Sequence, residues 1–103
     1  MNRDETLVLL VIIVERKQTD ALLTALPESG AHLIHTTYAR GSVRIGSLPC
    51  ALGLVPEKDK AIILCLLTHE KSDVILRLLT EQFHFGKPNT GIAFTVPIDQ
   101  LVY

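Results

Sequence analysis

The chain has 103 residues, which is the length of one compact domain. Ten basic and eleven acidic residues give a formal net charge of −1, which argues against broad electrostatic binding to nucleic acid or to an anionic membrane. Apolar residues make up 48% of the chain and aromatic residues 5%, so the core is expected to be aliphatic.

The first apolar run, residues 7–14, reads LVLLVIIV and has charged residues on both sides. It is too short to span a bilayer, and the flank before it is more acidic than that of a signal peptide. A short run rich in Leu, Ile and Val predicts a buried strand. Cys50 and Cys65 form no disulfide or zinc pattern, so we expect a cytoplasmic protein that does not insert into a membrane.

A helix is predicted to follow, begun by Thr19 or Asp20 and ended by Pro27. Its apolar positions are Ala21, Leu22, Ala25 and Leu26. Residues 31–38, AHLIHTTY, predict a second and more polar strand, which suits the edge of a sheet.

Residues 39–60 predict a long loop with one short helical turn around Cys50–Leu52, and loops of this length in small domains are usually functional or disordered. A third strand is predicted at 61–67 and a helix at about 70–84, followed by a turn and a last strand in the segment IAFTV. The residues expected to share one face of that helix are Val74, Ile75, Leu78, Leu79 and Phe83.

The predicted order is therefore β-α-β, loop, β-α-β, in a single domain over residues 1–103. It is the order of a ferredoxin-like α+β sandwich, in which two helices lie on one face of a four-stranded antiparallel sheet and the first and third strands are central. In the strands at 7–14 and 61–67, both alternating sets of side chains are apolar. Two helices can cover only one face, so we expect an oligomer to bury the other.

The residues do not indicate an enzyme or a metal site. His32 and His35 are three apart in a predicted strand, so they point to opposite faces and do not chelate one metal together. Cys65 is expected in the core, and Cys50 has no adjacent base that would activate its thiol. We therefore expect neither catalysis nor a bound metal.

Two segments suit the binding of an anion. Arg40 stands beside Gly41, and a guanidinium group pairs well with phosphate or carboxylate; the alternative is a solvated connection. In KPNTG, Asn89 and Gly91 are expected to adopt left-handed backbone conformations, so that N–H groups form an anion-binding nest near Lys87. The alternative there is a turn that only reverses the chain.

The element order, YARG at 38–41 and TGIAFTVPID at 90–99 together resemble the PII-type nitrogen regulatory signalling proteins, in particular their PII-like branch. The resemblance covers nearly all of the chain. YARG stands where the family's large T-loop leaves the second strand. The later segment is similar to the family's B-loop and the strand that follows it.

The resemblance implies a non-enzymatic homotrimer whose sheets face inward, with an adenine nucleotide bound as effector in clefts between the subunits. The T-loop would correspond to residues 39–60 and would engage a regulated target protein in signal transduction. The residues placed at the T-loop base are Tyr38, Ala39, Arg40 and Gly41, and those placed in the B-loop are Asn89, Thr90, Gly91 and Ile92, with Lys87 nearby.

Two departures from the family pattern bear on the effector. Ile92 stands where the family's B-loop typically has a lysine, and no arginine follows the last strand. Because a hydrogen bond to a charged group is worth about 1.5–3 kcal/mol, a less charged nucleotide or another small anion fits better than ATP. The alternative interpretation is a CutA- or ACT-like oligomer that binds a metal ion or another small molecule.

Overall fold

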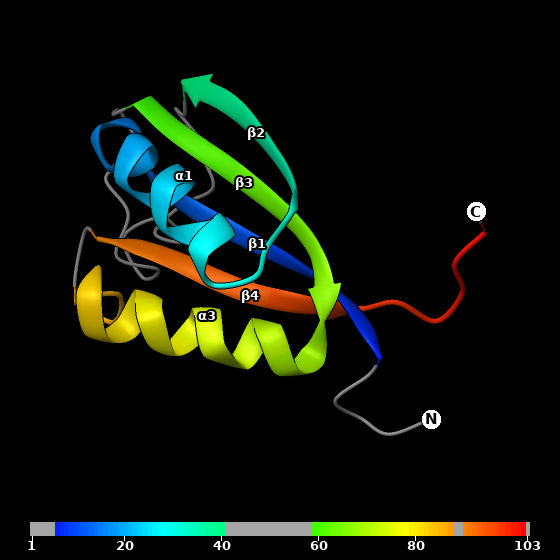
Figure 1. Ribbon diagram of the computed structural model, residues 1–103. Coiled ribbons are helices and arrows are strands. Elements are labelled where there is room, and N and C mark those ends of the chain that lie inside the picture. The colour runs from blue at the N-terminus through cyan, green and yellow to red at the C-terminus, as the bar shows by residue number, and fades with distance from the viewer. Residues whose placement is uncertain (1–5, 41–58, 88–89, 103) are drawn as a thin grey trace.

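The computed structural model describes residues 6–40, 59–87 and 90–102 (Figure 1). Its elements, in chain order, are strand β1 (Leu7–Glu15), the short 3-10 helix η2 (Arg16–Gln18), helix α1 (Thr19–Glu28), strand β2 (Leu33–Arg40), strand β3 (Asp59–Thr68), helix α3 (His69–Gln82) and strand β4 (Gly91–Pro97). Neither α-helix in the described ranges has the length and apolar character needed to cross a membrane.

The four strands form one antiparallel sheet in the order β2-β3-β1-β4. Strands β1 and β3 are central, and the more polar β2 lies at an edge, as predicted. Both helices lie on the same face of the sheet (Figure 1). The ferredoxin-like β-α-β-β-α-β fold is therefore confirmed.

The core lies between this face of the sheet and the two helices. Alternate residues of β1 and β3 point into it. Each helix contributes a row of apolar side chains along one side, made of leucines in α1 and of an isoleucine and a leucine in α3. Its buried members in these four elements are Val8, Leu10, Ile12, Val14, Leu22, Leu26, Ala61, Ile63, Cys65, Leu67, Ile75 and Leu79. The core is aliphatic, as the composition indicated.

Helix α1 begins and ends differently from the prediction. Its N-cap is Gln18, at the end of η2, so neither Thr19 nor Asp20 caps it. Pro27 lies inside the last turn, and the chain leaves the helix at Gly30, whose φ is 98°. Gly30 N donates to Pro27 O and Ala31 N to Leu26 O, which is the Schellman arrangement that a glycine with positive φ permits.

Helix α3 buries a narrower stripe than predicted. Ser72, Ile75 and Leu79 are buried, whereas Val74 is half exposed, so its assignment to the buried face was wrong. At 100° per residue, Val74 lies on the side of the helix opposite Ser72. The buried stripe is therefore centred on the line through Ser72 and Leu79.

The strands on either side of the predicted loop extend further into it than expected. Strand β2 continues through Arg40 and β3 begins at Asp59, so residues 39, 40, 59 and 60 pair in the sheet. Strand β2 also begins at Leu33 instead of residue 31. The rest of the predicted loop, with the helical turn expected at Cys50–Leu52, lies outside the described residues.

The second face of the sheet carries the other alternating set, and in the described part of the chain no helix covers it. We call it the open face. Three rows of apolar residues cross it in the pairing register: Leu33, Leu66, Leu9 and Val96; Leu64, Val11 and Phe94; and Ile62, Ile13 and Ile92. The polar residues His35 and Thr37 complete the second and third rows at the β2 edge. The two-sided apolar character of the central strands is thus as predicted.

Candidate functional site

The two segments predicted to bind an effector lie at the same end of the sheet. Tyr38 pairs with Ala61, Ala61 with Val14, and Val14 with Gly91, so the four residues form one row. Tyr38 is on the β2 edge and Gly91 on the β4 edge. With strands 4.7–4.9 Å apart, about 14 Å of sheet separates them. One chain therefore presents the two segments on opposite edges and does not bring them together.

On the β2 edge, Tyr38 is stacked with an arginine that directly follows β1. The guanidinium carbon of Arg16 lies 4.5 Å from the centroid of the Tyr38 ring, which is a cation–π contact. Arg16 Nη1 also lies 3.7 Å from Asp59 Oδ2. Arg16 thus links the end of β1 to the last residues of β2 and to the first residue of β3.

The remaining residues of this segment continue the edge strand. Ala39 pairs with Lys60 and Arg40 with Asp59 in the register of β2 and β3. Gly41 lies outside the described residues. The predicted T-loop base is therefore the end of a paired strand, which holds its backbone in an extended conformation.

A polar hollow of about 230 Å³ lies beside this strand end and is lined by Glu15, Arg16, Lys17 and Asp59. Lys17 Nζ is 3.3 Å from Glu15 Oε2, and Arg16 lies near Asp59 as described above. Each of the two cations that line the hollow therefore has a carboxylate nearby. These four residues were not predicted from the sequence. The available signal was that charged residues end one central strand and begin the other, because antiparallel neighbours bring those two points together.

On the β4 edge, the turn after α3 contains two residues with left-handed backbone conformations. They are His84, with φ of 61°, and Gly86, with φ of 98°. Lys87 follows, with an exposed side chain, and its N–H donates to His84 O at 3.2 Å. Thr90, in the turn just before β4, is half-buried. Asn89 lies outside the described residues.

Gly91 differs from its prediction. Its φ is not positive, and it is a buried residue at the first position of β4. A Cβ there would lie 2.7 Å from Phe85 Cζ and 2.9 Å from Ile13 O. Gly91 is therefore required by close packing against Phe85, not by a left-handed conformation.

Ile92 pairs directly with Ile13, so both side chains lie on the open face. This position continues the third apolar row of the sheet. A lysine at residue 92 would project from the same backbone position onto an apolar surface. The isoleucine thus fits the sheet face on which it stands.

Cys65, His32 and His35 lie outside these two segments. Cys65 is buried in β3, and its burial raises the pKa of the thiol to about 11. His35 is on the open face, where its Nε2 is 3.0 Å from Thr37 Oγ1, and His32 precedes β2. Among the described residues, no group of three His, Cys, Asp or Glu side chains is arranged to hold a metal ion.

Comparisons with known proteins agree on the fold. A crystal structure described as a PII-like signalling protein, from Thermus thermophilus, matches with a TM-score of 0.67 and 24% identity over 91% of this chain and 88% of that one. CPII from Thiomonas intermedia, solved with ADP, AMP and acetate, matches with a TM-score of 0.69 and 16% identity over 91% of this chain and 87% of that one.

No protein-family model and no curated protein sequence matches the chain. At the identities of the structural matches, the shared property is the fold. The predicted resemblance to PII-like signalling proteins is confirmed at that level.

Proposed function

We propose that this protein is a PII-like regulatory protein without enzymatic activity, which binds a small effector between the subunits of a homotrimer. The observation that carries the proposal is the row from Tyr38 to Gly91, because it puts the two candidate segments at one end of the sheet but on opposite edges. A ligand that contacts both segments needs the β2 edge of one subunit beside the β4 edge of another. The open face provides an apolar surface on which such subunits associate.

Each edge contributes its own set of residues to the proposed cleft. The β2 edge supplies Tyr38, Ala39, Arg40 and Gly41, and the β4 edge supplies Lys87, Asn89, Thr90, Gly91 and Ile92. Arg40 and Lys87 are the cations of this set. Because arginine binds phosphate or carboxylate through two parallel hydrogen bonds, Arg40 is proposed as the anchor for the effector.

The proposed effector is an adenine nucleotide with fewer phosphates than ATP, or another small anion. CPII, which shares the fold, was solved with ADP and AMP, and this supports a nucleotide of low charge. The direction of Ile92 supports the same choice, since the side chain at this position faces the open face and offers no charge to a phosphate. Residues 39–60 are proposed to transmit binding to a target protein in the cytoplasm, in a pathway such as nitrogen regulation.

Thermal unfolding with ATP, ADP, AMP and cyclic AMP, together with a light-scattering mass, tests this function. A ligand at a hundredfold excess over its Kd stabilises the folded state by about 2.7 kcal/mol. ADP or AMP should stabilise the wild-type trimer, and Arg40→Ala should abolish this effect without lowering the melting temperature of the unliganded protein. Arg77→Ala, which changes an exposed arginine on α3, is the matched control.

If ADP or AMP stabilises Arg40→Ala as much as it stabilises the wild type, Arg40 is not part of the effector site. A monomeric mass would contradict the cleft between subunits.

A further inference from the structure

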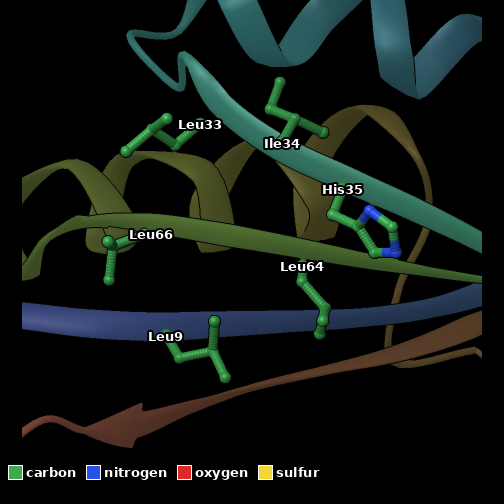
Figure 2. A pocket seen from close by; sticks show the side chains of 6 residues that line it. All are labelled: Leu9, Leu33, Ile34, His35, Leu64 and Leu66. Atoms are coloured by element: carbon green, nitrogen blue, oxygen red, sulfur yellow. The ribbon is translucent and has the colours of Figure 1, made fainter.

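The open face contains a groove of about 350 Å³, lined by Leu9, Leu33, Ile34, His35, Leu64 and Leu66. Figure 2 shows the lining side chains from three adjacent strands, with Leu9 from β1, Leu64 and Leu66 from β3, and Leu33 and His35 from β2, while the side chain of Ile34 points toward α1. Leu33 is 65% exposed, although it is a large apolar residue beside other leucines. The groove is therefore an apolar site with room for additional side chains.

A second exposed apolar element follows β4. We call residues 98–102 the exit segment. Ile98 N donates to Leu7 O at 3.4 Å, which fixes the start of this segment next to β1. Beyond it, Leu101 is 44% exposed and Val102 96% exposed. In Figure 1 the segment runs outward past the end of the sheet.

The groove and the exit segment lie at the same end of the sheet. Val96, at the end of β4, pairs with Leu9, Leu9 pairs with Leu66, and Leu66 pairs with Leu33. Val96 is the residue just before Pro97, where β4 ends and the exit segment begins. Leu33, at the other end of the row, lines the groove on the opposite edge of the sheet. Within one chain, the groove begins at Leu9, one strand from β4, and its far side at Leu33 lies three strands from β4.

Within its own chain, the exit segment would have to be fully extended across the sheet to reach the far side of the groove at Leu33. Crossing from the β4 edge to Leu33 requires about 14 Å, at 4.7–4.9 Å per strand. Ile98 is held at β1, and the four residues from Ile98 to Val102 span at most about 14 Å when fully extended, at 3.3–3.6 Å per residue. The segment would also have to turn back under the sheet, which shortens its reach further.

We propose that Leu101 and Val102 of one chain fill the groove of a second copy, at the end of the sheet opposite the proposed effector cleft. This contact rests on the proposed function, in which copies of the chain associate through their open faces. A four-stranded face with three apolar rows covers only a few hundred Å², whereas a stable interface buries roughly 800 Å² per partner. The exit segment extends the contact beyond the flat face.

Charge is compatible with this occupant. His35 is the one ionisable side chain among the six that line the groove, and Asp99 is the one ionisable side chain of the exit segment. A histidine beside an aspartate is a favourable pair, and the other groove residues are apolar, as are Leu101 and Val102. The charged residues of the open face, Glu15 and Lys60, lie in the row beyond Ile13 and Ile62, away from the groove.

Cysteine cross-linking tests which chain occupies the groove. In a Cys50→Ser background, with the buried Cys65 retained, a Leu33→Cys chain is mixed with a Val102→Cys chain that carries a mass-shifting tag, and the mixture is oxidised. We expect a disulfide between the two kinds of chain. Val74→Cys, at a 50% exposed position on α3, is the matched control and should not cross-link to Val102→Cys.

Sedimentation provides an independent measurement. Because both residues are exposed in the isolated chain, Leu101→Asp with Val102→Asp should fold normally, and we expect it to raise the dissociation constant of the assembly at least tenfold. Val74→Asp should leave this constant unchanged. If the double variant and the wild type have equal dissociation constants and no cross-link forms, the inference is wrong. The trimer of the proposed function would still stand.

Two other outcomes are distinguishable. A Leu33→Cys, Val102→Cys double variant that closes a disulfide within one chain would overturn the assignment to a second copy. A wild-type protein that sediments as a monomer would overturn the proposed function itself, and the exit-segment contact with it.

Discussion

The guanidinium group of Arg16 lies over the ring of Tyr38, 4.5 Å from its centroid, and joins the end of a central strand to the edge strand of the same sheet. Its Nη1 is also 3.7 Å from Asp59 Oδ2, at the start of β3. One side chain thus contacts residues just before and just after the segment 41–58. Arg16, the residue that directly follows β1, therefore supports the candidate T-loop base.

Replacing Arg16 by alanine should lower the free energy of unfolding by about 1 kcal/mol. An exposed cation–π contact contributes about 0.5–1 kcal/mol and an exposed ion pair about 0–1 kcal/mol. Arg16→Lys should recover only part of the loss, because an ammonium group does not stack as a planar guanidinium does. Urea unfolding measures the difference, with Arg77→Ala as control. Equal unfolding free energies for Arg16→Ala and Arg77→Ala would contradict the expectation.

Gly91→Ala should destabilise the protein by about 1–3 kcal/mol, the usual cost of an overpacked site. The added Cβ would lie 2.7 Å from Phe85 Cζ and 2.9 Å from Ile13 O, and neither a core ring nor a backbone carbonyl in a central strand can easily move away. Chemical denaturation of the variant measures this cost.

A second substitution identifies the cause of that loss. Phe85→Leu removes the ring atom closest to the new Cβ, so Gly91→Ala should cost less in a Phe85→Leu background than in the wild type. If the cost of Gly91→Ala is the same in both backgrounds, Phe85 is not the residue that requires a glycine here.

Ile92→Lys should weaken the assembly instead of improving the binding of ATP. The lysine would stand beside Ile13 on the open face, and burying an ammonium group among aliphatic side chains without a partner is costly. The variant should sediment as smaller species than the wild type at micromolar concentration. Val74→Lys, on the exposed side of α3, should sediment like the wild type. A stable trimer of Ile92→Lys with raised ATP affinity would refute this placement.

Cys65 should make stability fall at alkaline pH. Its pKa is raised from 9.0 to about 11 in the folded state, so the folded protein holds the thiol proton more tightly than the unfolded chain. This contribution is complete below pH 9 and is lost as the pH rises from 9 toward 11, with a change of about 1 kcal/mol by pH 10. Unfolding free energies from pH 8 to 10.5 measure it. Cys65→Val should show a shallower fall over that range, and parallel curves would contradict the assignment.

The same residue should react slowly with thiol reagents. At pH 8, a thiol with a pKa of about 11 is ionised in roughly one molecule in a thousand, and Cys65 is also inaccessible. In a Cys50→Ser background, the folded protein should react with a disulfide reagent many-fold more slowly than the urea-unfolded protein. Equal rates would show that the β3 position is open to solvent.

Local patterns predicted the elements well and their ends less well. The apolar runs in β1 and β3 were identified as central strands with two apolar faces, because alternation along a strand is visible in the sequence. Pro27 was expected to end α1, but it lies in the last turn, and the exit at Gly30 depends on hydrogen bonds made there. Val74 was assigned to the buried side of α3 because it is apolar, although its angular position opposes Ser72.

The sequence predicted the two segments of the candidate site but not how their residues are arranged in space. Arg40, Lys87 and Gly91 were chosen because arginine, lysine and glycine suit an anion site at a turn. Arg16 was not chosen, since its contact with Tyr38 joins residues far apart in the sequence. The reason for Gly91 was also wrong, because Phe85 and Ile13 approach it only once α3 and β1 are in place.

By itself, the sequence determined the kind and order of the elements, the aliphatic core and the second apolar face, because these follow from side-chain periodicity within each segment. Only the tertiary structure decided which residues share a row. The register of β2 on β3, β3 on β1 and β1 on β4 places Tyr38 level with Gly91, Ile92 beside Ile13, and the exit segment at the end of the sheet that holds the groove. Register depends on the simultaneous pairing of segments distant in the chain, and a shift of one residue would reverse every one of these faces.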